Sequence, residues 1–443
     1  MDQAQAAALL ARLDRLTVLS HAAGHPAARA LRALLSALAQ PGAPEGTPEG
    51  ALTAGFTRAY GAVYRAWLDC LAEGHGGFGG ALRAAVLFAP CPLATLCARL
   101  PYAQLPYSLL RAGAHDLAAL GELAALESAA ILALAARAGI PAEAAGAMPS
   151  WELSPPHGPP DPRLADIELS ARGMPALAAF FRRHGAGLFA AYPGLIWVGV
   201  DAEHPLGLRG VRFPDPVQLE ELAPYPPIEA PRQALLDNTL ALLAGRPAAN
   251  ILLYGDKGTG KSATVKALLS RFWLEGLRIV EAPLAHLAQL PQIFALLREQ
   301  PGKFIVFVDD LAFFEGGSAY TALKAVLEGG LEARPGNAVV YATSNRRNIV
   351  RQRLSDGQDE VHERDALAEK FSLADRFDLR LTFPAPSQEE YLHIVTALCA
   401  ARGVRLSEES RAEALAWTVT RGGRSPRLAR QFADALARRA AQR

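Results

Sequence analysis

Residues Asn250–Leu269 read NILLYGDKGTGKSATVKALL, and this stretch decides the fold expected for the second half of the chain. The apolar run Ile251–Tyr254 predicts a strand, the glycine-rich stretch Gly255–Ser262 a loop, and the amphipathic run that follows a helix. The loop matches G-x-x-x-x-G-K-[ST] at every fixed position, a pattern whose backbone N–H groups surround phosphate oxygens. The alternative is a chance glycine-rich turn, but the flanking strand and helix favour a phosphate site.

The predicted phosphate site comprises the loop and the first turn of the next helix, whose positive N-terminal end favours anions. Lys261 is expected to reach the β- and γ-phosphates of a nucleotide, and the Ser262 hydroxyl to hold Mg²⁺. The nucleotide-binding residues predicted from this stretch are Gly255, Asp256, Lys257, Gly258, Thr259, Gly260, Lys261, Ser262 and Ala263.

Composition indicates a globular protein with more than one domain. The chain has 443 residues, of which 51% are hydrophobic and 20% charged, and its formal net charge is +1. Nucleic-acid binding is possible but not indicated, because this charge gives no overall basic field. The four cysteines lack C-x-x-C spacing, so we expect buried apolar side chains rather than a zinc site or disulfides.

Neither a targeting signal nor a membrane span is expected. The N-terminus carries acidic residues and lacks a basic-then-apolar signal pattern. The most apolar region, Leu117–Ile140, is interrupted by Glu122, Glu127 and Arg137, and it predicts a packed helix rather than a span. We therefore expect a cytoplasmic protein.

Four regions are expected along the chain. Residues 1–148 predict an all-helical domain of six or seven helices, which offers a surface for an unidentified protein partner. Residues 149–223 predict a proline-rich linker and a small mixed α/β region, with a strand at 195–200. Residues 224–386 alternate strands and helices, which predicts a doubly wound α/β nucleotide domain, and residues 387–443 predict a helical lid. Strands of the α/β domain are expected at 251–254, 277–281, 304–308, 338–343 and 379–383.

Two acidic residues follow the all-apolar run Phe304–Val308, which is typical of a central parallel strand buried on both faces. Ligands of open α/β sheets bind at the carboxyl ends of the strands. We therefore expect Asp309 to bind Mg²⁺, directly or through water, and Asp310 to polarise an attacking water. The alternative is an acidic pair that only caps the next helix.

Three further residues are candidates for the same site. Asn345 ends the next strand, between the Asp309 strand and the phosphate loop, and could contact the γ-phosphate or orient water; Thr343 and Ser344 rank behind it. Arg376 precedes the last strand, where it could neutralise charge on the γ-phosphate of a neighbouring subunit. Arg427 follows the helix-starting Pro426 and could reach the nucleotide from the lid. Each residue has a plainer alternative. Asn345 could belong to an ordinary strand-to-loop turn, and Arg376 could form a surface pair with Asp375. Arg427 could be one more arginine in an arginine-rich tail.

From about Pro224 to Arg443 the chain resembles an AAA+ ATPase. The Walker A, Walker B, sensor 1, arginine-finger and sensor 2 residues of that family correspond to Lys261/Ser262, Asp309/Asp310, Asn345, Arg376 and Arg427. The D-R-F and S-P-R-x-A sequences are similar to those of the branch-migration helicase and clamp-loader branches. The whole chain, with its helical N-terminal half and its V-D-D-L sequence, resembles more closely an uncharacterised bacterial family known only as ATP-binding. The resemblance implies ATP and Mg²⁺ as cofactors and a homo-oligomer.

The chain departs from the AAA+ pattern at three places. Asp310 stands where the family usually has Glu, and Pro224–Ile228 replaces the usual Gly-Tyr pair before the first helix. A polar insertion, Leu354–Asp365, separates Asn345 from Arg376, and it is either a solvated loop or an element between subunits.

Three functions remain open from sequence. The first is an Mg²⁺-dependent ATPase that remodels a macromolecule as an oligomer. The second is a slow or non-hydrolysing switch or adaptor, which the Asp at position 310 favours. The third is a loader associated with nucleic acid, against which the near-zero net charge argues.

Overall fold

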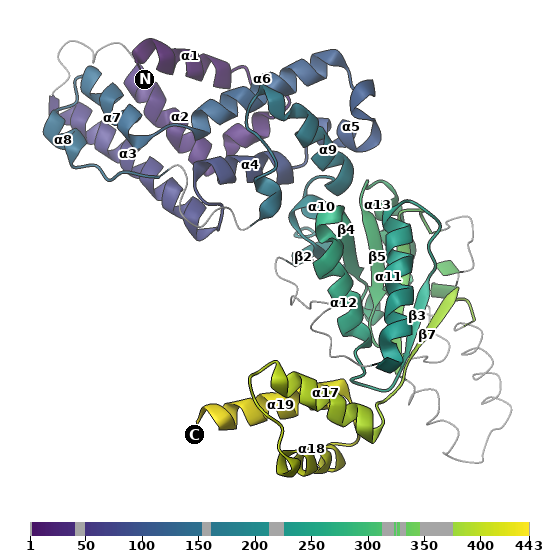
Figure 1. Ribbon diagram of the computed structural model, residues 1–443. Helices are drawn as coiled ribbons and strands as arrows, with labels where there is room; N and C mark the ends of the chain where they lie inside the picture. Colours follow the sequence, from purple (N-terminus) through teal and green to yellow (C-terminus); the bar gives the residue numbers. More distant parts are fainter. Residues whose placement is uncertain are drawn as a thin grey trace. The chain divides into compact units, whose positions relative to one another are not determined.

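The computed structural model describes residues 2–39, 49–152, 161–211, 226–311, 323–324, 326–327, 334–345 and 375–442. The chain divides into two compact units, Met1–Ala191 and Tyr192–Arg443, which are drawn in purple to blue and in teal to yellow in Figure 1. This division differs from the boundaries expected at 148/149 and 223/224. The first part of the predicted linker region packs with the N-terminal helices, and its second part joins the sheet.

The N-terminal unit is helical. Its α-helices are α1 (Gln3–Leu13), α2 (Pro26–Ala39), α3 (Glu49–Ala72), α4 (Phe78–Phe88), α5 (Pro92–Arg99), α6 (Tyr107–Ala124), α7 (Ser128–Arg137), α8 (Ala142–Gly146), α9 (Met174–His184) and α10 (Leu188–Ala191). Eight of them fall within the described part of 1–148, where six or seven were expected. The difference arises from short proline-initiated helices and from the Leu117–Ile140 region, which breaks into α6 and α7.

The leucine spacing in this unit buries one face of each helix. On α2, Leu31, Leu34, Leu35 and Leu38 follow the i, i+3, i+4, i+7 pattern and are all buried. They belong to a core that also contains residues of α1, α3 and α7. The helical class predicted for this region is confirmed.

Asp116 on α6 is a fully buried carboxylate. Its Oδ2 accepts the backbone N–H groups of Thr17 and Leu19, each at 2.9 Å, and His115 Nδ1 lies 3.1 Å from its Oδ1. A buried charge is costly without such partners. Asp116 therefore ties the segment that follows α1 to the middle of α6.

Unit 2 is built on a seven-stranded sheet of order β2-β1-β4-β5-β6-β3-β7. Its strands are β1 (Gly194–Trp197), β2 (Leu208–Val211), β3 (Ile251–Gly255), β4 (Leu277–Glu281), β5 (Lys303–Val308), β6 (Ala338–Asn345) and β7 (Leu379–Phe383). All neighbours are parallel except β1 and β2. The five strands predicted for the nucleotide domain are confirmed to within two residues at each end.

The predicted strand at 195–200 corresponds to β1, which extends the same sheet instead of forming a separate region. β1 pairs in parallel with β4 and antiparallel with β2. Within β2, Gly210 lies against the ring of Tyr192, where a Cβ would come within 2.4 Å of the ring. The short β2 strand, which was not expected, therefore depends on a close contact with a residue distant in sequence.

The helices of unit 2 are α11 (Glu229–Leu243), α12 (Lys261–Phe272), α13 (Leu290–Arg298), α17 (Gln388–Ala400), α18 (Glu408–Thr420) and α19 (Pro426–Ala441). Ile305 and Phe307 of β5 share one core with buried residues of α11 and α12, while Phe304, Val306 and Val308 point to the other face and are also buried. The central strand is thus covered on both sides, as its apolar run predicts.

The three C-terminal helices pack on one another, and buried residues of α17 and α19 belong to the core of unit 2. The ring of Trp417 on α18 meets that of Phe432 on α19 edge-on, with 5.7 Å between the centroids. The predicted helix at 320–327, the segments Pro224–Tyr225 and Arg346–Arg347, and the insertion Leu354–Asp365 lie wholly or largely outside the described residues.

Two further expectations concern apolar residues. All four cysteines are free and buried, as predicted, and burial raises the pKa of the Cys70 thiol to about 12.

In the described part of the chain no single helix is long and apolar enough to cross a membrane, although the bent pairs α4–α5 and α6–α7 reach that length and composition together.

Candidate functional site

The Gly255–Ser262 loop connects the end of β3 to the start of α12. Gly255 has φ +152°, and a Cβ at this position would lie 2.0 Å from the carbonyl oxygen of Phe383 at the end of β7. Gly258 has φ +83°, and its Cβ would come within 3.4 Å of Arg427 and within 3.1 Å of Ser425 Oγ. Backbone conformation and close packing therefore both require glycine at these two positions.

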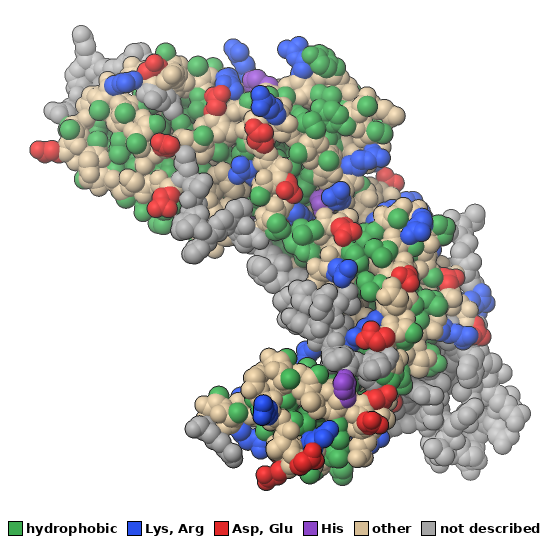
Figure 2. Space-filling view, viewed as in Figure 1, with side chains coloured by type: hydrophobic (Ala, Val, Ile, Leu, Met, Phe, Trp, Pro, Cys, Tyr) green, Lys and Arg blue, Asp and Glu red, His purple; other side chains and the backbone are tan. Residues whose placement is uncertain are grey.

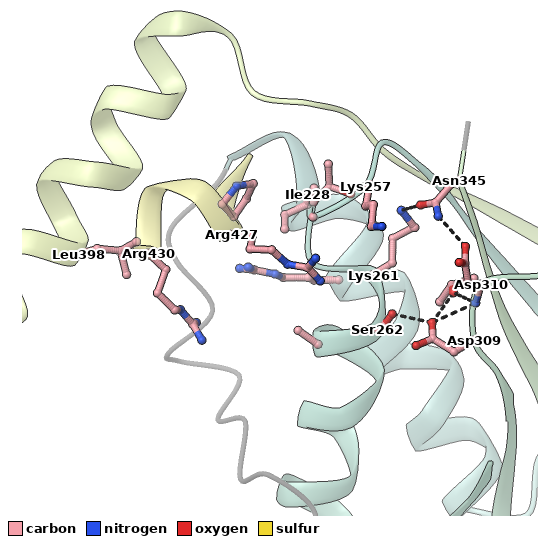
Figure 3. Close-up of a pocket in the computed structure, with 17 residues that line it drawn as sticks. Ile228, Lys257, Lys261, Ser262, Asp309, Asp310, Asn345, Leu398, Arg427 and Arg430 are labelled. Atoms are coloured by element: carbon pink, nitrogen blue, oxygen red, sulfur yellow. Dashed lines mark hydrogen bonds between the residues drawn. The ribbon is translucent and has the colours of Figure 1, made fainter. Parts of the chain in front are cut away.

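Lys261 points back over the loop from the first turn of α12 (Figure 3). Its Nζ donates to Gly255 O at 2.9 Å, Asp256 O at 2.8 Å and Asn345 Oδ1 at 3.2 Å, which uses all three protons of an ammonium. The side chain is only 6% exposed. Burial lowers the pKa of Lys261 to about 8, although the nearby carboxylates of Asp256, Asp309 and Asp310 act in the opposite direction.

Asp309 follows β5 and faces the first turn of α12. Its Oδ1 accepts the Ser262 hydroxyl at 2.7 Å and the Thr343 hydroxyl at 2.6 Å. A hydroxyl beside a carboxylate is the kind of hard oxygen pair that Mg²⁺ prefers. The two residues predicted to hold the metal are thus in direct contact.

Asp310 lies beside Asn345 at the end of β6. Asn345 Nδ2 donates to Asp310 Oδ1 at 2.5 Å, while Asn345 Oδ1 accepts from Lys261. Asp310 has φ +54°, a left-handed conformation that is uncommon for residues other than glycine. The Asn345 amide therefore links the loop lysine to the second acidic residue (Figure 3).

These groups surround a cavity of about 310 Å³. Its lining combines the acidic side chains of Asp309 and Asp310 with the apolar side chains of Ile228, which precedes α11, and Leu398 of α17. Its lining residues are Ile228, Arg232, Lys257, Gly258, Thr259, Gly260, Lys261, Ser262, Ala263, Asp309, Asp310, Thr343, Asn345, Leu398, Pro426, Arg427 and Arg430. Five basic side chains and two acidic ones suit a polyanion that brings a divalent cation.

The C-terminal helices contribute to this cavity through α19. The Arg427 backbone N–H donates to Gly258 O at 3.4 Å, so the first turn of α19 contacts the Gly255–Ser262 loop. Figure 3 shows the Arg427 side chain reaching from α19 towards the loop. Within the described residues, neither the Arg427 nor the Arg430 side chain forms an ion pair, and both are exposed.

The structure brings most of the predicted residues together, with one exception. The loop from Lys257 to Ala263 lines the cavity with the two acidic residues, Asn345 and Arg427, while Gly255 and Asp256 contribute carbonyl oxygens to Lys261. Arg376 lies in the turn before β7 with an exposed side chain, and it is not among the lining residues.

The cavity is also lined by Thr343, which was expected only behind Asn345, and by Arg232 and Arg430, which no sequence motif predicted. Thr343 lies two residues before Asn345 on one strand, so the period of a strand places both side chains on the same face. Arg430 follows Arg427 by three residues on α19, which places both on one side of the helix. Ser344 points the other way and donates to Leu311 O at 2.9 Å.

On the visible face of the N-terminal unit, the described basic, acidic and apolar side chains are intermixed (Figure 2). This distribution resembles an ordinary solvated surface.

Comparisons with known proteins agree with the bounds of unit 2. A family model described as "Protein of unknown function (DUF815)" matches residues 192–440, which is more than half of the chain. No curated protein sequence matches significantly.

Solved structures with low similarity include Thermotoga maritima RuvB, described as a Holliday junction branch migration motor, and Aeropyrum pernix ORC1 in complex with DNA. RuvB is 15% identical, with a TM-score of 0.33, over 49% of this chain and 63% of its own. ORC1 is 15% identical, with a TM-score of 0.37, over 52% of this chain and 63% of its own. The matches thus span less than two thirds of either protein. On the strength of the family model, the chain belongs to the DUF815 family of proteins of unknown function.

Proposed function

We propose that the protein is an Mg²⁺-dependent ATPase of the AAA+ type. The observation that carries this proposal is the convergence of Lys261, Ser262, Asp309, Asn345 and Arg427 on one cavity. They come from the ends of three neighbouring parallel strands and from α19, so distant parts of the sequence supply one polar site. Ligands of open parallel sheets bind at this edge.

The side chains divide the chemistry between them. Lys261 and Arg427 bind phosphate oxygens, and Ser262 with Asp309 holds Mg²⁺, which neutralises charge on the phosphates when bound. Asn345 holds Oδ1 of Asp310, which leaves Oδ2 of that carboxylate to accept a proton from the attacking water.

The proposal is tested by steady-state ATP hydrolysis in the presence of Mg²⁺. We expect Lys261→Gln to bind nucleotide only weakly and to lose turnover, and Asp310→Asn to bind ATP but lose roughly 100-fold or more in turnover. If the wild-type protein binds no nucleotide, the proposal is wrong. If Asp310→Asn turns over like the wild type, another group activates the water.

We further propose that the active form is a homo-oligomer that remodels a macromolecule, with the N-terminal helices binding a protein partner. Arg376 supports this arrangement, because its side chain is exposed and does not line the cavity of its own chain. In an oligomer it could instead reach the cavity of a neighbouring copy. Arg376→Ala and Lys261→Ala proteins, each inactive alone, are expected to recover turnover when mixed. No gain on mixing would contradict shared sites.

A second candidate is a slow nucleotide-dependent switch. The Asp310 carboxylate is one methylene shorter than Glu and is already bonded to Asn345 at 2.5 Å, which favours slow hydrolysis. Turnover measured beside particle mass, with and without ATP, separates the two candidates. Rapid multiple turnover removes the switch, whereas ATP-dependent assembly with little turnover, together with a faster Asp310→Glu variant, supports it.

A further inference from the structure

One threonine side chain of β6, Thr343, contacts the turn that follows β5. Thr343 is 2% exposed, and its hydroxyl makes two hydrogen bonds in opposite directions. Oγ1 donates to Asp309 Oδ1 at 2.6 Å and accepts the Asp310 backbone N–H at 2.8 Å. One hydroxyl therefore contacts both acidic residues of the cavity.

The bonds to Asp309 are unevenly divided between its two oxygens. Oδ1 accepts from Ser262, from Thr343 and, at 3.2 Å, from the Asp310 N–H. Within the described part of the chain Oδ2 accepts no hydrogen bond. Figure 3 shows the dashed lines converging on a single oxygen of Asp309. The carboxylate is thereby held by one oxygen, and the other is left for a cation or its water.

The same hydroxyl also supports the unusual backbone at Asp310. Asp310 has a left-handed conformation with φ +54°. Its backbone N–H faces β6 and donates a hydrogen bond to Thr343 Oγ1. The Asp310 side chain then meets Asn345 on the same strand. Loss of this acceptor removes a bond that favours the strained conformation.

We propose that Thr343 is a positioning residue for the metal and water groups of the cavity, acting through Asp309 and Asp310. This inference rests on the proposed function, because it assigns Thr343 a part in the same Mg²⁺-nucleotide site. Groups that orient metal-binding carboxylates typically change metal affinity 10–100-fold when removed.

The attachment of the turn itself does not depend on the Thr343 hydroxyl. The Leu311 N–H donates to the Thr343 carbonyl at 2.7 Å, and the Ser344 hydroxyl donates to the Leu311 carbonyl at 2.9 Å. These bonds involve neither acidic side chain. Ser344→Ala therefore provides a matched control, since it removes a buried hydroxyl from the same turn without changing the partners of Asp309.

The test compares Thr343→Val, which keeps the side-chain shape, with Thr343→Ser, which keeps the hydroxyl. Mn²⁺ binding in the presence of a non-hydrolysable ATP analogue is followed by electron paramagnetic resonance, and analogue binding is measured separately with chelator. We expect Thr343→Val to weaken Mn²⁺ binding roughly 10–100-fold while metal-free analogue affinity stays within about twofold. Thr343→Ser and Ser344→Ala are expected to bind Mn²⁺ like the wild type.

Wild-type Mn²⁺ affinity in Thr343→Val would overturn the inference and leave the proposed function standing. An equal loss in Ser344→Ala, or an equal loss of metal-free analogue binding, would show a merely structural role and overturn it as well. Absence of Mn²⁺ and analogue binding in the wild-type protein would refute the proposed function itself. If thermal unfolding shows that Thr343→Val does not fold, Thr343→Ala takes its place with the same expected results.

Discussion

If the proposed function holds, we expect the buried ammonium of Lys261 to make nucleotide affinity depend on pH in a direction fixed by its environment. Burial lowers the pKa of Lys261 from 10.5 to about 8, which corresponds to roughly 3 kcal/mol of discrimination against the charged form. A bound triphosphate adds negative charge beside Nζ, so the pKa in the complex is higher than in the free protein. Binding above about pH 8 must therefore take up a proton.

The pH window follows from these two states. Below about pH 8 the lysine is charged in both states, and the dissociation constant is independent of its titration. Between about pH 8 and the higher pKa of the complex, the free protein holds a neutral amine, and each pH unit weakens binding about tenfold. The phosphate groups do not contribute to this pH dependence, because their last ionisation lies near pH 6, below the range measured.

Isothermal titration calorimetry with the ATP analogue and Mg²⁺, from about pH 7.5 to about pH 9.5, measures both effects. We expect a flat affinity that begins to fall near pH 8, and a proton uptake that rises above that pH, measured in buffers of different ionisation enthalpy. The matched control is Lys261→Gln, which has no titrating amine and is expected to bind weakly at every pH. A wild-type affinity that does not change over this range, or the same slope in Lys261→Gln, would refute the reasoning.

Three further substitutions test packing around the site and in the N-terminal unit. Gly258→Ala places a Cβ 3.1 Å from Ser425 Oγ, at a residue whose φ is +83°, and we expect about 1–2 kcal/mol of strain. Binding of the ATP analogue, measured by fluorescence titration, should weaken roughly tenfold, and unchanged binding would contradict this. Asp116→Ala leaves two backbone N–H groups without their acceptor, and we expect chemical denaturation to show a loss of about 3 kcal/mol, with a loss below about 0.5 kcal/mol counting against a structural role. Tyr341→Phe is expected to lower the free energy of unfolding by only about 1 kcal/mol in the same assay. Its partners Asn238 and Thr239 each keep another hydrogen bond, to Ala249 O and Leu235 O, and a loss above about 3 kcal/mol would contradict that reasoning.

The strands around the cavity were predictable because their apolar runs are continuous. β4 and β7 have the predicted bounds, and β5 begins one residue earlier than expected. Such runs are strong signals for strands buried on both faces, and the glycine loop marks the edge of the sheet at which the proposed ligand would bind. The placement of Asn345 between the Asp309 strand and the phosphate loop is likewise confirmed by the strand order.

Other features depend on contacts that the sequence does not express. β2 is a four-residue strand containing Gly210, whose pairing with β1 and packing on Tyr192 are tertiary. The left-handed conformation of Asp310 was also unforeseen, because an Asp-Asp pair gives no sign of positive φ. The contacts of the Thr343 hydroxyl with Asp309 and Asp310 follow only from the register in which β5 and β6 pair.

The contact between Gly255 and the end of β7 has a consequence for how this motif changes during evolution. Two separate demands act on the glycine-rich loop: Lys261 and Ser262 face the cavity, whereas Gly255 packs its backbone against Phe383 O. If the proposed nucleotide use were lost in a descendant, the first demand would disappear but the second would not, since any side chain at position 255 would force the two strands apart. In such a lineage we expect Lys261 to be substituted while Gly255 is retained. A glycine at position 255 without the lysine therefore indicates the fold, and not the chemistry of the site.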